Sequence, residues 1–323
     1  MRVAVVGAGI SGLTCANLLT QQGIDATVFE KSRGSSGRAS TRRLDDVAFD
    51  HGAQYFTVRD HAFQATVDRW LAAGVVAEWD GRIVSVENGV HTAVGPRQRY
   101  VGVPGMSSIG RHLARGLDVR LSQPIQELAR AGRKWVIIGA DGRRHTDFDR
   151  VVLSAPAPQT RVLADGVAPD IAAHAARVDF APCWAVFASF EQPLPVAFDG
   201  AFCQRSALSW IARNSSKPGR AGNETWVLHG SPDWSREHFD DDTATVTAQL
   251  STAFAATVGE NLPAPATIHA HRWAYALPPE PLPERALLDR AAGIAACGDW
   301  CGGPRVEGAY LSGLAAARLF TEE

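Results

Sequence analysis

The sequence predicts an α/β fold in which a Rossmann-like dinucleotide-binding domain is interleaved with a second domain. Three observations support this prediction. A glycine-rich strand-to-helix turn opens the chain, a second strand ends in an acidic residue, and another strand-to-helix segment lies at the C-terminus. The 323 residues suffice for one large domain or two interleaved ones.

The bulk composition is that of an ordinary globular protein, with 46% hydrophobic and 20% charged residues. A net charge of −2 argues against a nucleic-acid partner. Five cysteines, an odd number, favour a reducing compartment over a disulfide framework. Cys297 and Cys301 have no second pair at zinc-ligand spacing, so no metal is expected. Because no signal peptide and no apolar run of ~18 residues is found, we expect a cytoplasmic protein without a membrane partner.

The first element is the buried strand "RVAVVGAG", which leads into the helix "ISGLTCANLLTQQG". Gly7 permits the tight turn, Gly9 lets the backbone approach a pyrophosphate, and Gly12 lets helix and strand pack closely. The helix N-terminus offers free N–H groups to phosphate. The alternative is a glycine-rich turn in an unrelated α/β fold. The expected cofactor contacts are Gly7, Gly9, Ile10, Ser11 and Gly12.

The second strand, "DATVFE", ends in Glu30, which can accept hydrogen bonds from ribose hydroxyls and repels a 2′-phosphate. Lys31 follows it and is also expected at the cofactor. The loop "KSRGSSGRAST" then carries Arg38, a second clamp on the pyrophosphate through charge-assisted hydrogen bonds. A simple NAD-binding domain has no need of such a clamp.

The C-terminal segment "IAACGDWCGGPRVEGAYLSGLAAARLF" reads as a strand followed by an amphipathic helix. Gly298 and Asp299 end the strand, and a carboxylate there suits a ribityl hydroxyl. The start of the helix supports the electron-rich edge of a flavin. One cofactor held at both ends of the chain must be long, which favours FAD over a nicotinamide. The helix residues expected at the flavin are Val306, Glu307, Gly308 and Ala309.

Several motifs together resemble the flavin amine oxidase superfamily and, within it, the bacterial renalases. They are "EKSRGSSGRASTRR", "DHGAQYFTVRD", "VGVPGMSSI", "APCWAVFASFE", "WIARNSSKPGR", "HRWAYA" and "CGDWCGGPRVEGAYLSG". The resemblance implies a Rossmann-like FAD-binding domain of the p-hydroxybenzoate hydroxylase/amine oxidase type, with an interleaved substrate domain of mixed β-sheet plus helices. It also implies that Pro124 and Ile125, at the start of a β-meander, contact the adenine. The expected division is 1–60, 100–160 and 290–323 for the FAD-binding domain, and 61–99 and 161–289 for the substrate domain.

Three groups are candidates for the reacting site. Gly52, Ala53 and Gln54 would pass close to the flavin, with Gln54 hydrogen-bonding over it; the alternative is an ordinary turn. The segment "WIARNSSKPGR" combines a stacking aromatic, an amide and two cations: Trp210, Asn214, Arg213 and Lys217. This combination suits a nucleotide-like substrate with phosphate and carboxamide groups, although such a segment is equally a polar surface loop. The third group is His229 together with His271, Arg272, Trp273 and Tyr275. Its aromatic rings could line the substrate cavity or belong to the core. The catalytic candidates are Gln54, Tyr55, Trp210, Asn214, His229, Arg272 and Trp273.

The renalase resemblance implies an FAD-dependent oxidase that converts 2-dihydro- and 6-dihydro-NAD(P) to NAD(P)⁺, by hydride transfer to flavin N5 with reduction of O₂ to H₂O₂. One alternative keeps the flavin but takes an amine or another small molecule as substrate. A second alternative is an NAD-binding dehydrogenase or a nucleotide sensor. Lys217 is the one candidate for the flavin-side lysine of many amine oxidases. The surroundings of Cys301 differ from covalent flavin motifs, so non-covalent FAD is expected.

Overall fold

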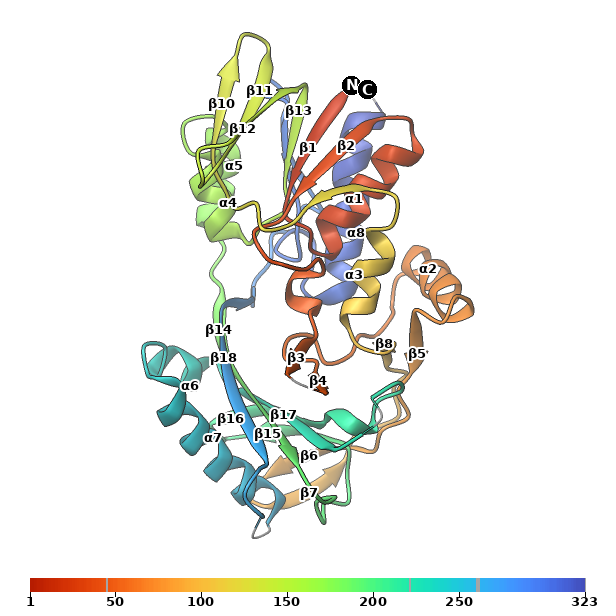
Figure 1. Ribbon diagram of the computed structural model, residues 1–323, viewed down its shortest axis with the longest axis vertical. Helices are drawn as coiled ribbons and strands as arrows, with labels where there is room; N and C mark the ends of the chain where they lie inside the picture. The colour runs from red at the N-terminus through yellow and green to blue at the C-terminus, as the bar shows by residue number, and fades with distance from the viewer. Residues whose placement is uncertain (45, 221, 260–261, 323) are drawn as a thin grey trace.

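The computed structural model describes residues 1–44, 46–220, 222–259 and 262–322. Figure 1 shows two sheet-containing parts, with both chain termini close together in the upper one. Within the described residues, no helix combines the length and apolar character needed to cross a membrane.

The upper part contains a six-stranded sheet in the order β19-β20-β13-β1-β2-β9. Its neighbours pair in parallel except β19 and β20, which are antiparallel. The central strands are runs of buried β-branched residues, as expected for a sheet covered on both faces. The strands are β1 (Arg2–Val6), β2 (Asp25–Phe29), β9 (Asp118–Arg120), β13 (Arg150–Leu153), β19 (Leu287–Asp289) and β20 (Ile294–Ala296).

Helices α1 (Ile10–Gln21), α3 (Ser107–Leu113) and α8 (Arg305–Thr321) lie together beside this sheet (Figure 1). Helix α8 approaches α1 so closely that a Cβ at Gly313 would lie 2.2 Å from the Ser11 carbonyl oxygen. A three-stranded antiparallel sheet and two helices form a second core with the other side of the sheet. These are β10 (Ile125–Ala131), β11 (Lys134–Gly139), β12 (Arg144–Phe148), α4 (Ala157–Ala164) and α5 (Pro169–Ala176).

The lower part is a seven-stranded sheet in the order β18-β14-β17-β16-β15-β6-β7, with α6 and α7 alongside β14 and β18 (Figure 1). All neighbours are antiparallel except β15 and β6. The apolar face of α7 packs on the sheet in a separate core. The elements are β6 (Ile83–Glu87), β7 (Val90–Ala93), β14 (Ala181–Phe190), β15 (Gly200–Gln204), β16 (Leu208–Arg213), β17 (Glu224–Gly230), β18 (Thr267–Leu277), α6 (Pro232–Glu237) and α7 (Thr243–Val258).

Short elements lie between the two large sheets, and the hairpin β3–β4 lies directly above the lower one (Figure 1). They are η1 (Gly37–Ala39), β3 (Arg42–Leu44), β4 (Val47–Phe49), α2 (His61–Ala72), β5 (Val76–Glu78), β8 (Tyr100–Gly102) and η2 (Asn214–Ser216). Since α4, α5 and β19 pack with the upper sheet, we propose that the second segment of the substrate domain runs from β14 to β18, a shorter span than 161–289. Strands β6 and β7 of the lower sheet belong to its first segment.

Candidate functional site

The glycine turn between β1 and α1 has the shape that a pyrophosphate requires. Gly7 has a φ of +111°, a conformation that favours glycine. A Cβ at Gly12 would lie 2.0 Å from the Gly7 carbonyl oxygen, so helix and strand meet only with glycine there. No atom lies within 4 Å of the Cβ position at Gly9, and no side chain caps the helix that starts at Ile10. The turn therefore leaves open backbone and free helix N–H groups for a phosphate, as FAD requires.

Glu30 lies directly beyond β2 and beside this turn. Its carboxylate accepts hydrogen bonds of 2.8 Å from the backbone N–H groups of Ala8 and Ser32, and the residue is only 6% exposed. Two acceptor oxygens carry about four lone-pair positions, so capacity remains for ribose hydroxyls. Lys31 is exposed. The Glu30 carbonyl oxygen accepts from the Gln123 N–H at 2.8 Å, which places Pro124 and Ile125 next to this end of the site.

Arg38 and Asp299 join the two ends of the chain. They form a bidentate ion pair with N–O distances of 2.7 and 2.9 Å, the geometry that makes such pairs strong. Arg38 also donates to the Ala276 carbonyl oxygen at 3.0 Å, at the end of β18. Gly298 donates its N–H to the hydroxyl of Ser312 in α8. The structure thus brings two predicted cofactor residues into direct contact. The guanidinium of Arg38 donates to Asp299 and Ala276.

The predicted flavin residues of α8 lie in its first turns. Glu307 accepts from the backbone N–H groups of Arg59 and Asp60 at 2.7 and 2.8 Å, so it ties the helix to the segment before α2. Val306 is buried, and Gly308 and Ala309 are partly buried. A cleft of about 380 Å³ opens at this helix start, and Glu307 and Gly308 are among its lining residues.

The loop between β4 and α2 is fixed in place by backbone contacts. A Cβ at Gly52 would lie 2.0 Å from the Arg38 carbonyl oxygen and 3.3 Å from the indole of Trp273. Ala53 donates its N–H to the same oxygen at 2.9 Å. The Gln54 amide donates to the carbonyl oxygens of Asp50 and Gly52 and accepts from Lys217 at 3.0 Å. Both ends of the Gln54 amide therefore brace the loop.

A buried cluster of charges lies behind this loop. Asp50 forms an ion pair with Arg220 and lies 3.7 Å from the Lys217 ammonium. Burial lowers the pKa of Lys217 from 10.5 to about 7, although Asp50 opposes the shift. Burial alone would raise the pKa of Asp50, but the charges of Lys217 and Arg220 outweigh this effect and hold that pKa below its usual value. Asn214 is also buried and donates to the Ala48 carbonyl oxygen at 2.9 Å.

Aromatic side chains surround the same region. The ring of Tyr55 lies 5.4 Å from that of Trp210 and 6.1 Å from that of Trp79. The indole N–H of Trp210 is buried without a hydrogen-bond partner among the described residues. Arg99 lies over the Tyr55 ring at 5.4 Å. Trp79 and Trp210 are buried in the core, whereas Tyr55 is only partly buried, so Tyr55 is the ring of this group that a planar ligand could reach.

His51 connects the loop to the lower sheet. Its carbonyl oxygen accepts from the Trp273 indole at 3.0 Å and lies 3.2 Å from His229 Nε2. Burial lowers the pKa of His51 to about 3 and that of His229 to about 4, so both rings are neutral at pH 7. Arg272 lies on the opposite face of β18, where it packs against Trp184 and Phe239.

The structure thus brings together most of the reacting-site candidates from the sequence, with Arg272 turned away. Sequence reasoning missed Asp50, His51, Trp79 and Arg220, and it left Lys217 undecided. For Arg272 the sequence did hold a signal. Side chains alternate between the two faces of a strand, so within β18 residues 271 and 273 share one face and residue 272 lies on the other.

Comparisons with known proteins identify a dinucleotide-binding segment and a flavoprotein family. The profile of the NAD(P)-binding Rossmann-like domain matches residues 5–70, and that of flavin containing amine oxidoreductase matches residues 92–320. Mouse renalase is 30% identical over 170 residues, which cover 49% of this chain and 48% of the renalase. A zeta-carotene-forming phytoene desaturase from Myxococcus xanthus is 45% identical over 51 residues, 16% of this chain and 10% of that protein. The matched segments therefore span half or less of these relatives.

Solved structures with the same fold cover the whole chain. A putative protoporphyrinogen oxidase from Exiguobacterium sp. 255-15 has a TM-score of 0.79 at 14% identity, covering 100% of this chain and 99% of that one. Putrescine oxidase bound to putrescine has a TM-score of 0.77 at 15% identity, with full coverage of both chains. Cyclohexylamine oxidase from Brevibacterium oxydans has a TM-score of 0.76 at 12% identity, with 99% and 98% covered. At these identities the likeness concerns the fold.

Proposed function

Because the chain belongs to the family of flavin containing amine oxidoreductases and uses FAD as its cofactor, we propose that it oxidises 2-dihydro- and 6-dihydro-NAD(P) to NAD(P)⁺. The match to mouse renalase carries this proposal. When bound, FAD accepts a hydride at N5 and passes the electron pair to O₂, which becomes H₂O₂. The glycine turn, Glu30 and the α8 start would hold the cofactor without a covalent bond.

The side chains of the site suit a substrate that needs orientation more than acid–base help. A dihydropyridine gives up hydride as its ring nitrogen lone pair restores aromaticity, and no proton must be removed from carbon. The neutral imidazole of His229 contacts the His51 carbonyl oxygen, and the neutral imidazole of His51 packs against the rings of His271 and Trp273. The partly buried rings of Tyr55 and Trp273 can align a flat ring and exclude water, with Trp210 packed behind Tyr55.

The charges of the site also favour a pyridine nucleotide over an ammonium substrate. Asp50 is paired with Arg220 and Lys217, and Asp299 is paired with Arg38. Neither carboxylate is therefore available as the counter-ion of an ammonium group. Around the loop, the guanidinium groups of Arg38, Arg99 and Arg220 still outnumber these two carboxylates, even when Lys217, with a pKa of about 7, is left out. This net positive charge suits a substrate that carries phosphates.

The test is anaerobic mixing of the yellow holoenzyme with each candidate substrate, followed by absorbance of the flavin. We expect bleaching by 2-dihydro- or 6-dihydro-NAD, and formation of NAD⁺ that chromatography detects. Putrescine and cyclohexylamine serve as amine controls. Bleaching by an amine, with none by either dihydropyridine isomer, would refute the proposal in favour of an amine oxidase.

A further inference from the structure

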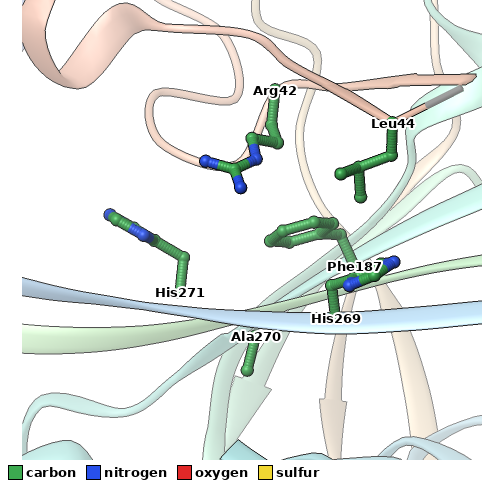
Figure 2. A pocket seen from close by; sticks show the side chains of 6 residues that line it. All are labelled: Arg42, Leu44, Phe187, His269, Ala270 and His271. Carbon is green, nitrogen blue, oxygen red and sulfur yellow. The ribbon is translucent and has the colours of Figure 1, made fainter. Parts of the chain in front are cut away.

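We propose that a small cavity between the β3–β4 hairpin and β18 is an anion subsite, which binds a phosphate of the substrate nucleotide. This inference rests on the proposed function, because it names the part of the substrate that the cavity takes. The cavity has a volume of about 70 Å³. Its lining residues are Arg42, Leu44, Phe187, His269, Ala270 and His271 (Figure 2).

The polar side chains that line the cavity are the guanidinium of Arg42 and the imidazoles of His269 and His271. No carboxylate is among its described lining residues. Figure 2 shows Arg42 reaching from the hairpin toward the Phe187 ring, with His271 on one side and His269 on the other. The guanidinium of Arg42 has no ion pair or hydrogen bond within the described part of the chain, while its backbone pairs with Phe49. Burial, and next the charge of Arg42, lower the pKa of His271, so it offers a neutral N–H. A guanidinium beside imidazole donors is a suitable set of ligands for phosphate.

The cavity is joined to the reacting site through ring contacts. Because β18 alternates its faces, His269, His271 and Trp273 lie on one side of the strand. The ring of His51 lies 5.0 Å from His271 and 4.9 Å from Trp273. Trp273 in turn packs on Gly52, in the loop expected at the flavin. The cavity therefore lies one ring beyond the expected ring-binding position, and in a nicotinamide nucleotide a ribose separates the ring from its phosphate.

The size of the cavity limits what it can hold. A volume of about 70 Å³ is several times the roughly 10–15 Å³ of cavity space that one water molecule needs. This suffices for one phosphoryl group, whereas an adenosine must lie outside. The subsite would therefore recognise the phosphate next to the nicotinamide ribose and would accept mononucleotides as well as dinucleotides.

The kinetic test compares Arg42→Ala with Arg43→Ala in the FAD-loaded protein. Arg43 is the neighbouring exposed residue of β3 and does not line the cavity, so its variant removes the same charge elsewhere. The substrates are the 2-dihydro and 6-dihydro forms of nicotinamide mononucleotide and of nicotinamide riboside. We expect Arg42→Ala to raise KM for the mononucleotide about 10- to 100-fold, as loss of a charge-assisted contact implies. The limiting rate of flavin bleaching and the KM for the riboside should not change.

Equilibrium binding separates the failure of this inference from the failure of the proposed function. The oxidised holoenzyme is titrated calorimetrically with nicotinamide mononucleotide, nicotinamide riboside and inorganic phosphate. We expect the wild type and Arg43→Ala to bind the mononucleotide more tightly than the riboside, and Arg42→Ala to lose this preference. Equal affinities in the wild type overturn the subsite, as does a preference that survives Arg42→Ala. If no dihydropyridine bleaches the flavin, the proposed function fails, and the titration still decides whether the cavity binds phosphate.

Discussion

The substitution Glu30→Gln tests the acidic residue of the dinucleotide site most directly. In the structure, each carboxylate oxygen of Glu30 accepts one backbone N–H at 2.8 Å, from Ala8 and from Ser32. A glutamine keeps one of these acceptors, while its NH₂ group faces the second N–H. Because Ser32 is an exposed residue, the glutamine oxygen keeps the buried Ala8 N–H and the Ser32 N–H loses its acceptor. An unpaired donor costs about 1–3 kcal/mol, and at this partly buried position we expect the free energy of unfolding of the apoprotein to fall by about 1 kcal/mol.

The same change should weaken FAD binding, because ribose hydroxyls lose a charged acceptor. A hydrogen bond to a charged group contributes about 1.5–3 kcal/mol, which corresponds to about a 10- to 100-fold higher Kd. Urea unfolding of the apoprotein measures the first effect, and fluorescence titration with FAD measures the second. A lower stability with an unchanged Kd would refute the ribose role and leave Glu30 as a brace of the glycine turn. No change in either quantity would refute both roles.

Three further predictions concern the glycine turn, the ion pair and the buried lysine. Gly12→Ala should unfold at a lower temperature because its Cβ would lie 2.0 Å from a carbonyl oxygen, whereas Gly9→Ala should keep its Tm and lose bound FAD; equal effects on Tm in thermal unfolding would contradict this. Arg38→Ala and Asp299→Ala should show a coupling energy of about 1–3 kcal/mol in a double-mutant cycle on apoprotein unfolding, and Asp299→Ala should also slow flavin bleaching; additive effects would show that the ion pair contributes nothing. The pKa of Lys217 falls from 10.5 to about 7 on folding, so above pH 7 the unfolded chain holds more protons and the free energy of unfolding rises with pH toward 10.5. Lys217→Met should remove this rise in urea unfolding between pH 7 and 9.5, and a variant with the wild-type slope would exclude Lys217 as its source.

Local elements of the dinucleotide domain could be predicted from the sequence because their signals are local. The turn after β1, the acid after β2 and the helix at the C-terminus each depend on a short run of residues. The prediction that both chain ends meet is confirmed by the contact of Arg38 with Asp299, 261 positions apart.

The reacting site was less predictable because it is assembled from distant segments. Asp50 is unremarkable in sequence, and only the fold brings Arg220 and Lys217 to it. The role expected for Gln54, a hydrogen bond over the flavin, concerns an amide whose polar atoms all have protein partners here. That role stays a prediction, and loading with FAD would require the amide to exchange one of these partners.

The contacts of the loop that carries Gly52 and Ala53 indicate which side chains can determine substrate specificity. Arg38 holds this loop from the upper part through its carbonyl oxygen, and Lys217 holds it from the lower part through Gln54. A loop fixed from both sides keeps one geometry at the ring-binding position, whatever substrate arrives. Differences in substrate must then be read by side chains with fewer fixed partners. Arg42 fits this description because it faces solvent and an open cavity. Among substrates that carry the same ring, the charge beyond the ring should therefore decide which one this site prefers.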